Sequence, residues 1–222
     1  MLKIFYLRIS DYPDIPDTFF YPYVGEDTRI AVQTYQNEQV RRSKLMGETM
    51  IRLKLQELWG LQQKDYRLLK GVHGKPYAGG TSCPVFFNLS HSGDYIVAAF
   101  AGSEVGVDIE KRKEQRMNVA RRFFHPQEVR QLEICPENKR EDLFYSYWSV
   151  KESFLKYTGS GLTAPLSGFE VHFTPEEIFI TREGRRENVC IKECPVDSGY
   201  KCFVCSENEE RPDIRPFRLV LS

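Results

Sequence analysis

The spacing of apolar residues in the first half of the chain predicts a long helix set among short strands. Residues 1–7 indicate a strand, and apolar positions over 28–59 recur with a helical period up to Gly60, a typical helix stop. Residues 71–84 contain four glycines and two prolines, which predicts a loop. Short extended segments are expected after this loop, over 85–88, 95–101 and 105–110.

The second half of the chain repeats this alternation of helix and strands. Helical spacing is strongest over 140–158, and Gly159 ends it. Further strands are indicated over 169–173, 178–182, 189–194 and 200–205. One long helix and largely consecutive strands in each half predict an α+β fold. We divide the chain into an N-terminal α+β half, 1–104, and a C-terminal α+β half, 105–222, which no internal sequence repeat relates.

Composition narrows the class of protein. The 222 residues include 31 Lys and Arg against 31 Asp and Glu, and the resulting net charge of zero disfavours a strongly basic nucleic-acid binder. Hydrophobic residues make up 41% of the chain, which is enough for a packed core. No apolar run approaches the ~18 residues that span a bilayer, and the N-terminus lacks a signal-peptide pattern. We therefore expect a cytoplasmic protein with no membrane or nucleic-acid partner.

Four of the six cysteines lie close together near the C-terminus, at positions 190, 194, 202 and 205. Such a group can form a zinc site, or its members can be buried in neighbouring strands. Phe203 and Val204 favour an extended backbone, and strand positions three apart face opposite sides of a sheet. The spacing of Cys202 and Cys205 therefore favours buried thiols over a zinc site, and disulfides are not expected in the cytoplasm.

Two acids two residues apart lie in the predicted strand at 105–110. Strand alternation places Asp108 and Glu110 on one face, together with Gly106. Like charges this close repel unless solvent screens them or a cation lies between them. The pair is therefore either an exposed strand end or part of a metal site. Gly106 favours the metal site, because it clears space for a close approach.

Two further charged residues lie on the aromatic helix predicted over 140–158. Glu152 and Lys156 are four residues apart and most simply form an ion pair on the helix surface. The aromatic composition predicts that this helix is largely buried, where a carboxylate and an amine need polar partners. A metal held by Asp108, Glu110 and Glu152 would provide such a partner, and an all-carboxylate ligand set suits Mg²⁺.

His91 lies at the end of a predicted strand, directly after Ser90. A histidine in this position can cap the local backbone, or it can donate an N–H group to a phosphate with Ser90 beside it. Adjacent Ser and His side chains seldom align as nucleophile and base, and the chain has no nucleophile elbow and no Walker-type glycine loop. Together with Lys75 and Lys156, His91 indicates a metal-assisted phosphate site.

In their order and spacing, these motifs resemble the Sfp-type 4′-phosphopantetheinyl transferase family. The resemblance covers residues 74–162 directly, and the flanks agree mainly in length and in the order of strands and helices. Each motif alone is weak, whereas the ordered set is highly specific. The matching stretches are 74–76, 87–92, 105–110, 123–124 with Glu128, 148–156, and then Gly159, Gly161 and Leu162.

The resemblance implies a reaction, a fold and a metal site. It implies transfer of the 4′-phosphopantetheine arm of coenzyme A to a serine of an apo acyl or peptidyl carrier protein, with release of adenosine 3′,5′-bisphosphate. The implied fold is two similar α+β halves packed as a pseudo-dimer, with the active site in the cleft between them; we expect a monomer. Asp108, Glu110 and Glu152 match the family's Mg²⁺ ligands. Glu152 also matches the proposed general base, a role that an alternative scheme gives to a metal-bound water.

Four further residues take roles from the same motifs. Lys156 matches the lysine that stabilises or protonates the leaving group. His91 matches the histidine that contacts the pyrophosphate, with Ser90 as its neighbour. Lys75 matches a basic contact to the nucleotide end of coenzyme A.

The expected contact to the 3′-phosphate departs from the family pattern. Family members often carry basic residues on the first long helix, where this chain has Thr28 and Ala31. Lys44 falls near the matching basic stretch, and we expect it to contact the 3′-phosphate. The departure bears on 3′-phosphate affinity and leaves the expected reaction unchanged.

The segment after Glu110 is expected to bind the carrier protein, because carrier domains of this kind present an acidic helix. Its basic residues are Lys111, Arg112, Lys113, Arg116, Arg121 and Arg122, and its apolar residues are Met117, Val119, Phe123 and Phe124. A basic rim around apolar contacts favours fast encounter and modest affinity. The alternative interpretation is a solvated charged face, with Phe123 and Phe124 in the core.

Two other classes of function stay open on the sequence alone. One is a non-catalytic protein that binds coenzyme A or a carrier, and the complete acidic trio argues against it. The other is a metal-dependent phosphohydrolase acting on small phosphate esters. Products separate the three possibilities, because a hydrolase would release phosphate without a carrier. The sequence leaves the pathway of the carrier open.

Overall fold

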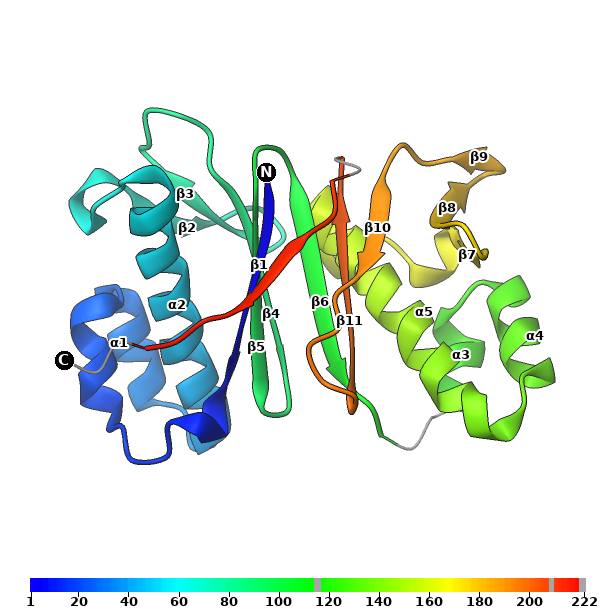
Figure 1. The fold of residues 1–222 in the computed structure, drawn as a ribbon, viewed down its shortest axis with the longest axis horizontal. Helices are drawn as coiled ribbons and strands as arrows, with labels where there is room; N and C mark the ends of the chain where they lie inside the picture. Colours follow the sequence, from blue (N-terminus) through cyan, green and yellow to red (C-terminus); the bar gives the residue numbers. More distant parts are fainter. Residues whose placement is uncertain (114–116, 208–209, 220–222) are drawn as a thin grey trace.

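The computed structural model describes residues 1–113, 117–207 and 210–219, and each half has helices outside and a sheet inside (Figure 1). The N-terminal half contains a sheet of strand order β12-β1-β5-β4 and a separate β2-β3 hairpin. Its strands are β1 (Leu2–Arg8), β2 (Arg67–Lys70), β3 (Pro76–Gly79), β4 (Phe86–Ser92), β5 (Tyr95–Ala101) and β12 (Asp213–Pro216). Its helices are α1 (Glu26–Gln33) and α2 (Glu38–Trp59).

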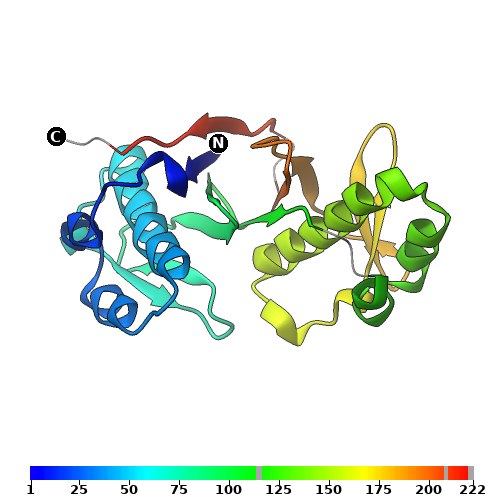
Figure 2. The ribbon, with the colours of Figure 1, turned by 90° about the horizontal axis from the view of Figure 1, so that it is seen from below.

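The C-terminal half contains a sheet of order β10-β11-β6 and a small sheet of order β7-β8-β9. Its strands are β6 (Val105–Lys111), β7 (Glu170–Phe173), β8 (Ile178–Arg182), β9 (Arg185–Arg186), β10 (Cys190–Glu193) and β11 (Tyr200–Ser206). Its helices are α3 (Met117–Phe123), α4 (Pro126–Ile134) and α5 (Glu137–Thr158). Figure 2 shows the halves as two lobes side by side, each with one 22-residue helix, α2 or α5. The predicted α+β fold of two similar halves is confirmed.

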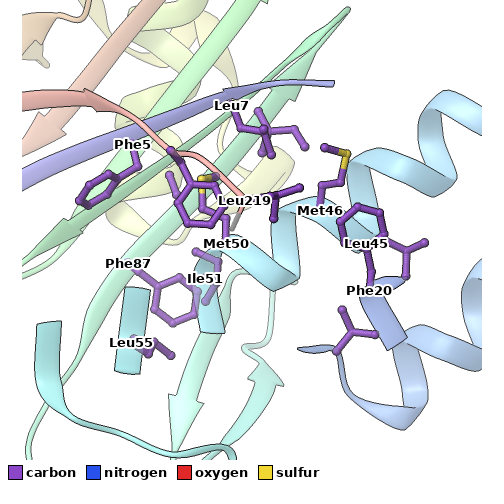
Figure 3. Close-up of a cluster of buried hydrophobic side chains, with 14 of the residues drawn as sticks. Phe5, Leu7, Phe20, Leu45, Met46, Met50, Ile51, Leu55, Phe87 and Leu219 are labelled. Carbon is purple, nitrogen blue, oxygen red and sulfur yellow. The ribbon is translucent and has the colours of Figure 1, made fainter. Parts of the chain in front are cut away.

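Three apolar cores connect the layers. The first lies between α2 and the N-terminal sheet and includes Leu45 and Met50 (Figure 3). The second lies between the two sheets, where Val97 of β5 and Val107 of β6 are fully buried. The third lies between α5 and the C-terminal sheet and includes Phe154. Strand β6 therefore has one apolar face in the second core and turns its other face towards α5.

The helix expected over 28–59 is divided into α1 and α2. The Asn37 side chain accepts a hydrogen bond from the Val40 N–H group, so it caps the start of α2. Gly60 has a φ of 70° and ends α2, as predicted. The helix expected over 140–158 is present as α5 and begins three residues earlier. Among the described residues, no helix is both long enough and apolar enough to cross a membrane.

The loop expected over 71–84 contains a strand. Residues Pro76–Gly79 form β3 and pair with β2, and Leu69 lies opposite Tyr77. The glycines and prolines that predicted a loop shape the turn at 71–75 and the end of the hairpin, where Gly74 and Gly80 have positive φ angles. The prediction was therefore correct for the turn and wrong for the paired segment.

The end of the chain returns from the C-terminal half to the N-terminal half, which the sequence pattern did not predict. Strand β12 pairs in parallel with β1 and crosses between the lobes in Figure 2. Phe217 and Leu219 are buried in the first core. The Lys54 ammonium lies 5.4 Å from the centre of the Phe217 ring. The boundary between residues 104 and 105 stays a prediction, and residues 213–219 pack with the N-terminal half.

Cys202 and Cys205 of β11 face opposite sides of the sheet. Cys202 lies in the second core and Cys205 in the third. Burial raises the pKa of both thiols. The strand alternation that disfavoured a zinc site is therefore present, and we expect purified protein to lack stoichiometric zinc.

Candidate active site

The site forms where β4 of the N-terminal half meets β6 of the C-terminal half. On one side, β6 pairs with β11 through its backbone. On its other side, alternate side chains of β4 accept hydrogen bonds from the β6 backbone, an arrangement that we call the seam. The seam bonds run from Val107 N–H to Asn88 Oδ1 (2.9 Å), from Ile109 N–H to Ser90 Oγ (3.3 Å) and from Lys111 N–H to Ser92 Oγ (3.1 Å).

The two acids of β6 lie beside the seam. The Ser90 hydroxyl donates to Asp108 Oδ1 at 3.0 Å, and the Ser92 hydroxyl donates to Glu110 Oε2 at 2.8 Å. Both serines therefore accept a backbone N–H and donate to a carboxylate. Asp108 is buried and Glu110 is half-buried, so the interpretation of the pair as an exposed strand end is wrong.

Helix α5 packs directly against β6 because residue 106 has no side chain. A Cβ atom at Gly106 would lie 2.1 Å from the Ser153 carbonyl oxygen and 2.3 Å from the Tyr157 amide nitrogen. The Ser149 hydroxyl adds a 3.0 Å hydrogen bond to the Asp108 carbonyl oxygen. The space that Gly106 clears is therefore filled by helix backbone. The close approach brings the α5 side chains next to the acids of β6.

Lys156 pairs with Asp108 and not with Glu152 among the described residues. Its Nζ atom lies 2.6 Å from Asp108 Oδ1 and donates to Ser90 Oγ at 2.8 Å. The surface ion pair that the spacing of Glu152 and Lys156 suggested is thus not formed. Lys156 instead links α5, β6 and β4 at one point.

The three carboxylates repel one another. Burial and then the charge of Asp108 raise the pKa of Glu110, which the hydrogen bond from Ser92 partly offsets. Burial and then Asp108 also raise the pKa of Glu152, and the charge of Lys156 partly offsets this. Glu152 feels the charge of both other acids and Glu110 feels that of Asp108, so the three carboxylates form one cluster with excess negative charge.

The chemistry of this cluster would suit a divalent cation. Asp108 Oδ2 is buried and has no hydrogen-bond partner in the part of the chain that the structure describes, which is costly for a carboxylate oxygen unless another group satisfies it. An all-oxygen donor set is what Mg²⁺ prefers, with remaining positions left to water and substrate. Among the described residues, no group of three or more His, Cys, Asp or Glu side chains is placed so that it could hold a metal ion. The fit rests on the unpaired oxygen and on the excess of negative charge.

His91 connects this cluster to the N-terminal half. Desolvation by the surrounding protein and then the positive charges of Lys156 and Lys44 lower the pKa of His91, while Asp108 raises it, although the side chain itself is exposed. The neutral form is therefore favoured, and a phosphate beside the ring would offset the two positive charges. Lys44 lies on α2, so cations from both halves approach the His91 ring.

Lys44 also lines a groove of about 860 Å³ between α1, α2 and the β2-β3 hairpin. Its other charged lining residues include Arg29, Glu48, Arg52, Arg67 and Lys70. Thr28 is buried in the groove wall and donates to Glu48 Oε2 at 2.5 Å, and Arg52 donates to Glu48 Oε1 at 2.8 Å. Glu48 and Arg52 were not among the residues predicted from the sequence. Glu48 lies four residues after Lys44 and Arg52 four residues after Glu48, so helical spacing along α2 was the available signal.

Lys75 lies apart from this groove. Its Nζ atom lies 2.6 Å from Glu104 Oε2 and donates to the Tyr157 carbonyl oxygen at 3.2 Å. With Gly159 among others, these residues line a hollow of about 260 Å³ at the end of α5. Glu104, which forms an ion pair with the Lys75 ammonium, was not predicted from the sequence.

Comparison of the sequence with known proteins divides the chain close to the junction at which the site lies. Residues 104–205 match the 4'-phosphopantetheinyl transferase superfamily, and residues 18–103 match the family described as 4'-phosphopantetheinyl transferase, N-terminal. The chain is 30% identical over 195 residues to 4'-phosphopantetheinyl transferase Sfp of Bacillus subtilis (strain 168), which covers 87% of each chain. It is 34% identical to 4'-phosphopantetheinyl transferase ffp of Bacillus subtilis, over 81% of this chain and 80% of that one.

The chain belongs to the 4′-phosphopantetheinyl transferase superfamily. It is of the Sfp type, and the family is a class of transferase enzymes. A further relative, 4'-phosphopantetheinyl transferase gsp of Aneurinibacillus migulanus, is 30% identical over 82% of this chain and 76% of its own length. The two family matches meet between residues 103 and 104, next to the start of β6. The site therefore lies where the two matched regions join.

Within this transferase fold, Glu128 is a structural residue. It is buried with Lys151, whose Nζ atom lies 2.8 Å from Glu128 Oε1 and donates to the carbonyl oxygens of Leu166 and Phe169 at 2.8 Å each. Burial raises the pKa of Glu128 and lowers that of Lys151. These bonds satisfy the buried pair and fix α4 and α5 against the loop before β7.

The segment expected to bind the carrier is divided between core and surface. Phe124 is 3% exposed and belongs to the third core, so its expected role as an apolar anchor is wrong. Phe123 is 40% exposed. Arg121 lies on the surface of α3 and pairs with Glu133 of α4 at 2.9 Å. Arg116 lies outside the described residues.

Proposed function

We propose that this transferase moves the 4′-phosphopantetheine arm of coenzyme A to a serine of an apo carrier protein and releases adenosine 3′,5′-bisphosphate. The observation that carries the proposal is the contact of Lys156 with Asp108 and Ser90 at the junction of the two halves. There, an anionic cluster suited to a cation lies next to His91, which feels the charge of Lys44 in the groove. Coenzyme A has a pyrophosphate with a nucleotide on one side. This order of groups matches the order of the acidic cluster, His91 and Lys44 in the site.

Asp108, Glu110 and Glu152 would hold Mg²⁺, which would neutralise charge on the pyrophosphate when bound. The unpaired Asp108 Oδ2 atom and the raised pKa values of the two glutamates support this ligand set. Because a cation would offset the repulsion among them, binding of metal would favour their ionised forms. Through the cation, these three residues would therefore hold the pyrophosphate of the substrate in place.

Basic and hydroxyl side chains bind and orient the phosphate groups of coenzyme A. Lys44 is proposed to contact the 3′-phosphate, since it lines the groove and Thr28 is committed to Glu48. His91 and Ser90 contact the pyrophosphate. Lys75 reaches the nucleotide end once a phosphate replaces Glu104 as its partner.

The chemical step is substitution at the β-phosphorus of coenzyme A. The carrier serine oxygen forms a bond to this phosphorus, and the bond to the bridging oxygen of the nucleotide breaks. Glu152, ionised beside the cation, would accept the serine proton. Lys156 stabilises the charge that develops on the leaving phosphate, or protonates it. The partial burial of Lys156 strengthens this interaction relative to bulk water.

We also propose that the protein acts as a cytoplasmic monomer without nucleic-acid or membrane partners. The net charge of zero supports the absence of a nucleic-acid partner. Size-exclusion chromatography with light scattering would measure the mass in solution. A dimer that persists at low concentration would contradict the monomer.

The proposed reaction predicts a defined product. Incubation of an apo carrier protein with this protein, Mg²⁺ and coenzyme A should raise the carrier mass by one phosphopantetheine arm, measured by mass spectrometry. Matched reactions without coenzyme A, or with a chelator in place of Mg²⁺, should leave the mass unchanged. Release of inorganic phosphate without carrier would show a hydrolase, and ligand binding without any product would show a non-catalytic protein.

Carrier binding at the basic segment predicts an effect of charge. Lys113 is exposed after β6, and Arg121 is exposed on α3. Reversing Lys113, Arg116 and Arg121 to Glu should slow carrier modification several-fold at subsaturating carrier and low salt, because attraction to an acidic carrier helix speeds encounter. Calorimetry should show unchanged binding of coenzyme A. Reversal of the exposed Arg185 in β9 is the control, and a wild-type rate in the triple variant would place docking elsewhere.

A further inference from the structure

Strand β6 is the edge strand of the β10-β11-β6 sheet, and the seam covers its free edge. Its backbone N–H groups on the β4 side have side-chain acceptors instead of a backbone ladder. Two of the three acceptors are serine hydroxyls, which can donate as well as accept. Each serine donates to the carboxylate of the β6 residue directly before the one whose N–H it accepts, so the N-terminal half directly holds two acids of the C-terminal half.

The two serines differ in their further contacts. Ser90 also accepts a hydrogen bond from Lys156, and Asp108 is held by Lys156 as well. Ser92 has a simpler environment, since its hydroxyl accepts from Lys111 N–H at 3.1 Å and donates to Glu110 Oε2 at 2.8 Å. The two bonds use its proton and a lone pair, which defines the orientation of the hydroxyl and of the Glu110 carboxylate.

We propose that Ser92 is a positioning residue, which fixes Glu110 for cation binding and couples this carboxylate to the placement of the two halves. The proposal rests on the proposed function of Glu110 as a Mg²⁺ ligand. Outer partners that hydrogen-bond a ligating carboxylate set its orientation, and their loss typically weakens metal affinity by about 10- to 100-fold. Nothing in the sequence pattern assigned a role to Ser92, because its partner lies 18 residues away on another strand.

The test measures cation binding directly. Mn²⁺ is titrated into the protein with coenzyme A present, and free Mn²⁺ is followed by its electron paramagnetic resonance signal. Ser92→Ala should weaken Mn²⁺ binding by roughly 10-fold. Ser92→Thr keeps a hydroxyl on a residue suited to a strand and should restore most of the affinity.

A matched control separates positioning from a general loss of stability. Asn88 accepts Val107 N–H in the same seam and donates to no carboxylate in the described structure. Asn88→Ala should lower the unfolding temperature and leave Mn²⁺ affinity within about 2-fold of wild type, since only outer partners of ligands are expected to change it. All titrations are done below the unfolding temperature of the least stable variant.

The outcomes distinguish the two proposals. Equal Mn²⁺ affinity in Ser92→Ala and wild type would overturn the positioning role, as would equal weakening in Ser92→Ala and Asn88→Ala. Failure of wild-type protein to modify a carrier, or full activity with a chelator, would instead overturn the proposed function. Weakening in Ser92→Ala that Ser92→Thr reverses, with Asn88→Ala unaffected, would support the positioning role.

Discussion

Asp108→Ala, Glu110→Ala and Glu152→Gln should each lower carrier modification by roughly 100-fold or more, because each removes charge that stabilises the transition state through the bound cation. The three acids lie on two elements that Gly106 brings into contact, and the charge of Asp108 raises the pKa of both Glu110 and Glu152. They should therefore act as a unit. A double variant should lose little more activity than either single variant, which is the non-additivity expected of one site.

Initial rates of carrier modification measure this loss, with folding checked by circular dichroism. Glu57→Gln is a matched control, since Glu57 is an exposed carboxylate on α2 whose partner is Lys54. It should keep wild-type rates. Near-normal turnover in both Asp108→Ala and Glu110→Ala would contradict the assignment of these acids to a metal site.

Glu152→Gln and Asp108→Ala should change the stability of the metal-free protein in opposite directions. The raised pKa of Glu152 means that its ionised form is less favourable in the folded protein than in the unfolded chain. Glu152→Gln should therefore raise the unfolding temperature in metal-free, mildly alkaline buffer. The gain should shrink as pH falls through the raised pKa of the folded state. Asp108→Ala should instead lower stability, because Lys156 and Ser90 lose their partner.

The local features of the site could be predicted from sequence. Asp108 and Glu110 share a face because strand geometry repeats every two residues, and a seven-residue strand leaves no other arrangement. The helix that carries Glu152 and Lys156 was predicted from its aromatic spacing. Both predictions depend only on neighbours within a few positions along the chain.

The partners of these residues could not be predicted in the same way. Lys156 bonds to Asp108, 48 residues away, instead of to Glu152 in the preceding turn of α5. Lys75 is paired with Glu104, and β12 joins β1 from the far end of the chain. These contacts depend on how two sheets meet, and no local periodicity encodes that. The division of the helix at Asn37 was different, since a capping residue was present in the sequence and was overlooked.

Gly106→Ala should reduce both stability and activity, because helix α5 cannot keep its place against an added methyl group. The new Cβ atom would lie 2.1 Å from the Ser153 carbonyl oxygen, so the helix backbone has to move outwards. Overpacking of this kind costs about 1–3 kcal/mol. Displacement of a reacting group by about 1 Å can lower the rate by roughly 100-fold.

Gly102→Ala is the matched control for this substitution. Gly102 lies in the turn before β6, and an added Cβ would meet no atom within 4 Å. Denaturant unfolding and carrier-modification kinetics should show near-wild-type behaviour for Gly102→Ala and a joint loss for Gly106→Ala. Lower stability with an unchanged rate in Gly106→Ala would mean that catalysis tolerates a displaced helix. A joint loss would instead mean that the absent side chain at residue 106 determines how closely Glu152 and Lys156 approach Asp108.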